Sequence, residues 1–177
     1  MIRCAVIAAA LALAAPAQAQ DAPPEGAPDM TKMGPMAKTV TNEAATQKEL
    51  AEWFKKNEAL GMKCDVEGMA DMIDFPVIMM SDNMAGKFGM MQLDRAQWIA
   101  MMQPFMDPDA MKDMKMTSKY KCFLMSDDLA SCEGALSMTI GKEKAKFNNH
   151  VILTRVDGKW KGKTMMEAGW GDMPAPK

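Results

Sequence analysis

Alternation of apolar and polar side chains in the second half of the chain constrains the fold more than any other feature. It runs through residues 116–124, 130–140, 145–156 and 160–166, with turn residues such as Asp157-Gly158 between the segments. Successive side chains of a β-strand point to opposite faces, so this period predicts four strands that each have one apolar face. The short turns predict that consecutive strands form antiparallel hairpins.

The length of each turn also predicts which residues lie opposite one another. The expected pairs are Cys122 with Cys132, Leu136 with Asn149, and Val151 with Thr164. These three registers place the apolar side chains on one common face, whereas a slip by one residue would turn a whole strand over.

The first half of the domain predicts helices that cover this face. Leu50, Trp53 and Phe54 form an apolar stripe in a helix over residues 42–60. A second helix is expected over 65–73, a short buried strand over 77–80, and a third helix after a capping box of Asp94 and Gln97. The expected fold is therefore α+β: a curved antiparallel sheet that forms a cone, packed against about three N-terminal helices, a cystatin-like roll.

The N-terminus has the features of a secretory signal peptide. Arg3 precedes an apolar run over residues 4–15, and Ala17-Gln18-Ala19 fits the small-x-small cleavage pattern. We therefore expect residues 1–19 to be removed and the protein to be exported, to the periplasm of a Gram-negative bacterium. The run is too short to span a bilayer, and no other stretch is apolar enough, so no membrane span is expected.

The remaining sequence divides into three parts. Residues 20–41 are rich in Pro, Ala, Gly and Met without any period, which predicts a flexible tether. Residues 42–171 form the domain, and residues 172–177 are expected to be a loose tail. The net charge of the chain is −2 and its lysines are not clustered on one segment, so the composition gives no reason to expect nucleic-acid binding.

Three motifs resemble the nuclear transport factor 2-like (SnoaL-like) superfamily. They are Asp74-Phe75-Pro76-Val77 after the second expected helix, Trp98 in the third, and the run HVILTRVDGKW over residues 150–160. Together with the order of helices before strands, they make residues 42–171 similar to that superfamily. The resemblance implies a cone-shaped domain, often dimeric, and a homodimer through the outer face of the sheet is one expectation. Members include enzymes, ligand binders and proteins without known activity.

The predicted inner face of the cone is apolar with a few polar groups, which is typical of a small-molecule site. The expected lining residues are Tyr120, Leu136, Met138, Phe147, Asn149, Val151, Thr164 and Met166. The alternative is that methionines fill the cone and leave no cavity. We expect an exported, non-catalytic binding or accessory domain that takes a small, largely apolar ligand.

Catalysis is an alternative that the resemblance implies, as an isomerase, dehydratase or hydrolase. Proton transfer needs a titratable group within reach of the substrate. The single histidine, His150, alternates with Asn149 and so faces outward, and no Asp or Glu lies on the predicted inner face. Only carboxylates from the helical half remain as candidates, and these are Asp65, Asp71, Asp74 and Asp82.

Methionine is unusually frequent, with 23 residues. Most can fill the core, but two clusters lie outside the apolar stripes: Met30, Met33 and Met36 in the tether, and Met111, Met114 and Met116 before the first long strand. Thioethers are soft ligands that select copper(I). Copper(I) binding by these clusters is therefore an alternative function; otherwise no cofactor is expected.

The mature chain keeps Cys64, Cys122 and Cys132. An odd number leaves at least one thiol free or paired between chains. Cys122 and Cys132, expected opposite each other, are either a cross-strand disulfide or two buried thiols.

Overall fold

The computed structural model describes residues 28–29, 32, 34, 38–83 and 85–168. The expected signal peptide at 1–19, most of the tether at 20–41 and the tail at 172–177 lie outside these residues. In chain order the elements are α1 (Glu43–Met62), α2 (Val66–Ala70), β1 (Ile73–Asp82), β2 (Phe88–Leu93), α3 (Arg95–Met102), the 3-10 helix η2 (Gln103–Phe105), α4 (Pro108–Met111), β3 (Met114–Ser126), β4 (Leu129–Ile140), β5 (Glu143–Val156) and β6 (Lys159–Glu167).

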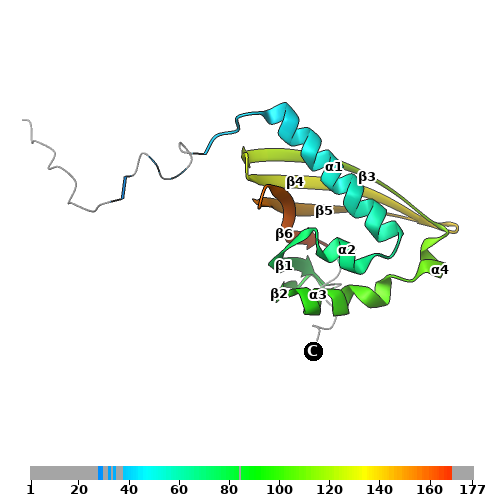
Figure 1. Ribbon diagram of the computed structural model, residues 1–177. Coiled ribbons are helices and arrows are strands. Elements are labelled where there is room, and N and C mark those ends of the chain that lie inside the picture. Colours follow the sequence, from blue (N-terminus) through cyan, green and yellow to red (C-terminus); the bar gives the residue numbers. More distant parts are fainter. Residues whose placement is uncertain (1–27, 30–31, 33, 35–37, 84, 169–177) are drawn as a thin grey trace, which may run out of the picture.

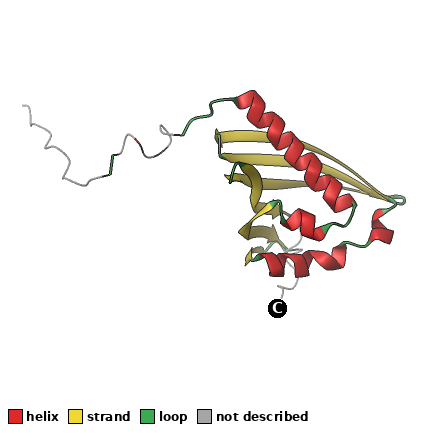
Figure 2. Ribbon diagram, viewed as in Figure 1, coloured by secondary structure: helices red, strands yellow, loops and turns green. Residues whose placement is uncertain are grey.

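The strands form one curved sheet in the order β2-β1-β6-β5-β4-β3. Helix α1 crosses β3, β4 and β5, and α1, α2 and α3 lie on the same side of the sheet (Figures 1 and 2). The predicted α+β class and the curved sheet covered by N-terminal helices are confirmed. The sheet is mixed rather than wholly antiparallel, because β1 runs parallel to β6 while all other neighbours are antiparallel.

Helix α1 begins and packs as its sequence predicts. The Asn42 side chain caps it by accepting a hydrogen bond from the backbone N–H of Ala45 at 3.1 Å. Leu50, Trp53 and Phe54 are buried against the inner sides of β4, β5 and β6. Burial of side chains of this size contributes about 1.5–3 kcal/mol each, so this stripe holds the helix on the sheet.

A second core cluster joins α2 and α3 to the strands β1 and β2. Ile73 and Val77 are buried in it, but both lie on β1, whereas we expected Ile73 in a helix over 65–73. Ile73 follows Met69 of the expected helix by four residues, and this spacing puts two side chains on one face in a helix and in a strand alike, so it could not separate the two structures. Strand β2 was not predicted, while the capping box of Asp94 and Gln97 at α3 is confirmed.

The register of the β3–β4 hairpin was predicted correctly, and that of the β4–β5 hairpin was wrong by two residues. Cys122 lies opposite Cys132, as expected. Leu136 pairs with Phe147 instead of Asn149, because a two-residue turn joins β4 to β5 where we expected four loop residues. A shift of two residues keeps every side chain on its predicted face.

The predicted register of the β5–β6 hairpin is also wrong, and this error places side chains of β6 on the wrong face of the sheet. Leu153 pairs with Gly162, but Ile152 pairs with Thr164, so Lys163 is an extra residue in β6. Beyond this bulge Val151 lies opposite Met165, where we predicted Thr164. A bulge of one residue turns the rest of the strand over, and the end of β6 therefore presents to the inner face the side chains that the sequence pattern assigned to the outer face.

Candidate functional site

The most distinctive polar feature of the inner face is the meeting of Tyr120 and Asn149 above Gly134. Gly134 on β4 pairs with Tyr120 on β3 and with Asn149 on β5. A Cβ atom at position 134 would lie 2.5 Å from Tyr120 Cε1 and closer still to Asn149 Oδ1. Glycine therefore provides the space in which the two side chains form a hydrogen bond.

Asn149 keeps an acceptor without a partner. Its Oδ1 atom is buried and accepts no hydrogen bond within the described part of the chain. Leaving a buried polar atom unpaired costs about 1–3 kcal/mol. A donor brought by a bound molecule would recover this energy.

The Tyr120 ring is held in position by α1. It stacks on Phe54 with the ring centroids 3.5 Å apart and an interplanar angle of 12°. Burial raises the pKa of the Tyr120 phenol, the hydrogen bond with Asn149 lowers it, and the charges of Glu58 and Glu167 raise it again. The raised pKa keeps the phenol protonated at neutral pH, so it can donate a hydrogen bond.

Glu58 reaches the site from α1. It follows Phe54 by one helical turn, and its carboxylate accepts a hydrogen bond from the Ser118 hydroxyl on β3. A cavity of about 290 Å³ lies between α1 and β3, and Glu58, Ser118 and Tyr120 line it. A carboxylate, a hydroxyl and a neutral phenol therefore line one cavity.

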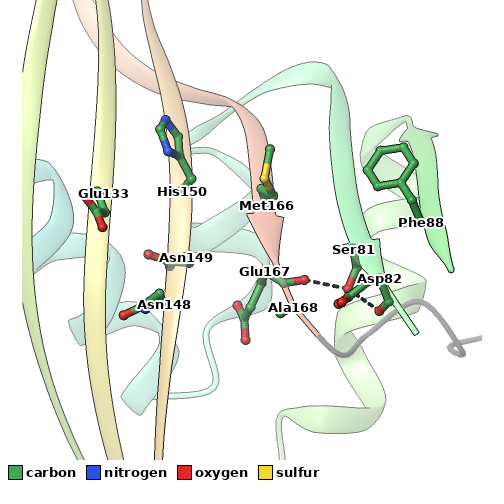
Figure 3. A pocket seen from close by; sticks show the side chains of 10 residues that line it. All are labelled: Ser81, Asp82, Phe88, Glu133, Asn148, Asn149, His150, Met166, Glu167 and Ala168. Atoms are coloured by element: carbon green, nitrogen blue, oxygen red, sulfur yellow. Dashed lines mark hydrogen bonds between the residues drawn. The ribbon is translucent and has the colours of Figure 1, made fainter. Parts of the chain in front are cut away.

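Glu167 comes from the other side, at the end of β6. It pairs with Asn149 and so shares the inner face with it, as a result of the bulge at Lys163. The backbone carbonyl of Glu167 accepts a hydrogen bond from the Ser81 hydroxyl at 2.5 Å (Figure 3). This bond ties the end of β6 to β1.

A second cavity, of about 390 Å³, opens beside this end of β6 (Figure 3). Strand β5 begins at Glu143, but its pairing with β6 starts only at Asn149, so the sheet has an open edge there. Side chains of both faces therefore line the cavity: Asn149 and Glu167 from the inner face, and His150 and Met166 from the outer face.

The structure brings together six of the eight predicted lining residues. Those on the inner face are Tyr120, Leu136, Met138, Phe147, Asn149 and Val151. Thr164 and Met166 lie on the outer face, because the bulge at Lys163 reverses the end of β6. The six do not surround one cavity: Tyr120 lines the 290 Å³ space and Asn149 the 390 Å³ space. A ligand-binding role for these residues stays a prediction.

The methionine clusters divide between described and undescribed residues. Met30, Met33 and Met36 lie outside the described residues. Met111 is the last residue of α4, while Met114 and Met116 lie on β3, where Met116 pairs with Met138 of the inner face. Copper(I) binding at either cluster stays a prediction.

The cysteines have two different environments. Cys122 and Cys132 form a disulfide between β3 and β4, and Cys64, which is partly buried, is free. The disulfide lies in the core that α1 covers.

Sequence reasoning missed Glu58, Gly134 and Glu167. Glu58 could have been found, because it is four residues after Phe54 on the same side of the helix. Gly134 interrupts the apolar alternation of residues 130–140, which is a weak signal of a close approach. Glu167 depends on a bulge for which the sequence offers no signal beyond Gly162 nearby.

None of the helices in the described part of the chain combines the length and apolar character needed to cross a bilayer.

Comparison with known proteins gives structural matches only: no family model and no curated protein matches the sequence. Solved structures that share the fold include the following three. An NTF2-like protein of unknown function from Shewanella oneidensis is 14% identical, with a TM-score of 0.56 over 69% of this chain and 98% of that one.

The second is the association domain of CaMKII from Caenorhabditis elegans, which is 10% identical, with a TM-score of 0.58 over 71% of this chain and 96% of that one. The third, a putative scytalone dehydratase from Novosphingobium aromaticivorans, is 10% identical, with a TM-score of 0.52 over 70% of this chain and 83% of that one. Identities this low establish the fold and nothing finer. The helix order, the curved sheet and these matches agree that the chain has the nuclear transport factor 2-like fold.

Proposed function

We propose that the protein binds a small, largely apolar molecule on the inner face of the cone and holds it through Asn149 and Tyr120. The observation that carries this proposal is the buried Oδ1 atom of Asn149, which has no partner among the described residues. Folded proteins rarely retain such an atom without a use for it. The neutral phenol of Tyr120 beside it offers a donor.

This pair of groups suggests the chemistry of the ligand. Asn149 Oδ1 needs a donor, and the Tyr120 hydroxyl can donate to an acceptor. A hydroxyl group on the ligand can do both. The rest of the ligand would contact apolar side chains of the inner face such as Phe147 and Leu136. We therefore propose an apolar molecule that carries a hydroxyl group.

Native mass spectrometry of the protein purified from its own host tests this proposal. The wild-type protein is expected to retain an organic mass, and Asn149→Leu to lose it, because leucine removes both hydrogen-bonding atoms at similar volume. Asn57→Leu is the matched control, since Asn57 lies on α1 and lines neither cavity. A wild-type protein without bound mass, or equal retention by Asn149→Leu, would refute the placement.

Acid–base catalysis on the bound molecule is a second candidate. It is favoured by two carboxylates, Glu58 and Glu167, whose charges act on the Tyr120 phenol. A carboxylate and a neutral phenol could move a proton next to a carbonyl group and stabilise the charge that develops. The test is deuterium exchange beside the carbonyl of small cyclic ketones, followed by NMR. Glu58→Gln should slow exchange about 100-fold or more, while Glu52→Gln, on the exposed side of α1, should not. Exchange no faster than in buffer excludes this candidate.

We also propose that the protein is exported and works in the periplasm. The disulfide between Cys122 and Cys132 supports this, because such bonds form and persist mainly in oxidising compartments. The intact mass of the protein recovered from a periplasmic extract is expected to correspond to a chain that begins at Gln20. A chain that keeps residues 1–19 and stays in the cytoplasm would contradict the proposal.

A homodimer through the outer face of the sheet is the proposed assembly. On the β3 side of that face, Phe123 and Met125 are 71% and 53% exposed. Large apolar side chains exposed together commonly mark an interface. Sedimentation equilibrium should show a dimer that Phe123→Asp dissociates. Phe88→Asp, at the opposite edge of the sheet, is the control and should leave the dimer intact. A monomeric wild-type protein would refute this assembly.

A further inference from the structure

Three methionines lie side by side on the outer face of the sheet. Met90 on β2 pairs with Met80 on β1, and Met80 pairs with Met166 on β6. Adjacent strands are about 4.8 Å apart, and directly paired residues point to the same face. The three thioethers therefore start from positions within about 10 Å of one another.

His150 extends this row by one strand. It pairs with Met166, and both side chains lie on the same side of the sheet at the edge of the 390 Å³ cavity (Figure 3). Nε2 of His150 is 2.7 Å from the Ser131 hydroxyl. This contact turns the ring toward Ser131 on β4, and three strand spacings separate His150 from Met90, so the imidazole does not reach an ion held by all three sulfur atoms.

Core packing does not account for this row. Met90 is 61% exposed and Met166 is 45% exposed. The same three strands carry a second row, Met91, Met79 and Met165, on the inner face, where these side chains pack against the core cluster of α2 and α3. The fold thus contains two rows with the same chemistry and register, of which the inner one packs against the core.

We propose that the outer row is a copper(I) site formed by the sulfur atoms of Met80, Met90 and Met166. Thioether sulfur selects copper(I) over harder ions. Methionine has three rotatable bonds, so its sulfur can adjust to a trigonal ion. Asp82 and Glu133 line the cavity beside Met166 and make the potential there favourable for a cation.

The chemistry of the described residues argues for copper(I) over zinc. Within the part of the chain that the structure describes, no group of three or more His, Cys, Asp or Glu residues could hold a metal ion. Zinc sites need such groups. A site of three thioethers suits a soft monovalent ion instead.

The test is competition for copper(I) between the full-length protein and bicinchoninate in the presence of ascorbate, without oxygen. A Cys64→Ser background removes the free thiol as a ligand. We expect one copper(I) ion per chain. Replacing the outer row by leucine, as Met80→Leu, Met90→Leu and Met166→Leu together, should weaken binding at least 100-fold.

The inner row provides the matched control. Met79→Leu, Met91→Leu and Met165→Leu together should leave copper(I) affinity unchanged, since Leu and Met have similar volumes and circular dichroism can verify the fold. Equal loss in the inner-row and outer-row variants, or no loss in the outer-row variant, would overturn the site. So would a wild-type protein that does not bind copper(I).

Two further variants separate this site from the other proposals. Changing the tether methionines Met30, Met33 and Met36 to leucine should preserve copper(I) binding. If this variant loses copper(I) while the outer-row variant binds it fully, the site lies in the tether instead. Asn149→Leu should lose the organic ligand but keep copper(I). The copper site can therefore fail while the proposed ligand binding holds, and the reverse.

Discussion

Gly134→Ala tests the central geometry of the site, because the added methyl group occupies the space in which Tyr120 and Asn149 meet. Its carbon would lie 2.5 Å from Tyr120 Cε1, and Asn149 Oδ1 would be closer still. Contacts this short force at least one of the two side chains away from its position. The change therefore removes the hydrogen bond between them and disturbs the stacking of Tyr120 on Phe54.

The expected cost follows from these contacts. A buried hydrogen bond contributes about 0.5–1.5 kcal/mol, and an aromatic pair about 0.5–1.5 kcal/mol. Alanine in a strand regains about 0.5–1 kcal/mol of backbone entropy relative to glycine. The net loss in the free energy of unfolding should be about 1–2 kcal/mol.

Urea denaturation followed by tryptophan fluorescence measures this loss as a lower midpoint with an unchanged slope. Gly89→Ala on β2 is the matched control, since the nearest atom to its Cβ would be the Ser81 carbonyl oxygen at 3.8 Å, an ordinary contact. We expect that variant to be as stable as the wild type or slightly more stable. If Gly134→Ala behaves like Gly89→Ala, the close approach of Tyr120 and Asn149 above β4 is wrong.

Three other changes have defined outcomes. The hydrogen bond from Arg155 at 2.7 Å, together with that from Trp160, lowers the pKa of Glu49 below its ordinary value of 4.5. The stability gained from this group is therefore present above pH about 4.5 and lost as the pH falls through the lowered pKa. Glu49→Gln should cost less than about 1 kcal/mol at neutral pH, because the pair is partly exposed, and the difference from wild type should shrink as the pH falls below about 4.5 in a denaturation series. Replacing Cys122 and Cys132 by alanine should cost about 2–3 kcal/mol in the same assay, and no cost would show that the bond is absent. Asp94→Ala should cost about 1 kcal/mol through loss of the cap of α3.

The fold was predictable where side-chain periodicity and turn chemistry agreed. Leu50, Trp53 and Phe54 identified the covering helix, and the Asp94 capping box identified α3. Alternation along β3, β4 and β5 placed their apolar faces correctly even though one register was two residues out. An error of two residues leaves every side chain on its predicted face, because side chains alternate between the two faces of a strand with a period of two residues.

The failures have physical causes as well. Ile73 follows Met69 by a spacing that suits both helix and strand, so β1 was recognised only in part. The bulge at Lys163 leaves no periodic signal, and it moved Thr164 and Met166 out of the predicted site while bringing Glu167 into it. The row of Met80, Met90 and Met166 joins the β1–β2 hairpin to β6, which is distant in sequence, and no local motif indicates it.

The most direct measurement of the central claim is the NMR response of the side-chain amide of Asn149 when the ligand extracted from the wild-type protein is added back. Our account predicts a slow-exchange shift of this amide and of the Tyr120 ring signals, with little change at Ile152 on the outer face. Shifts confined to the outer face, with the Asn149 amide unmoved, would contradict it.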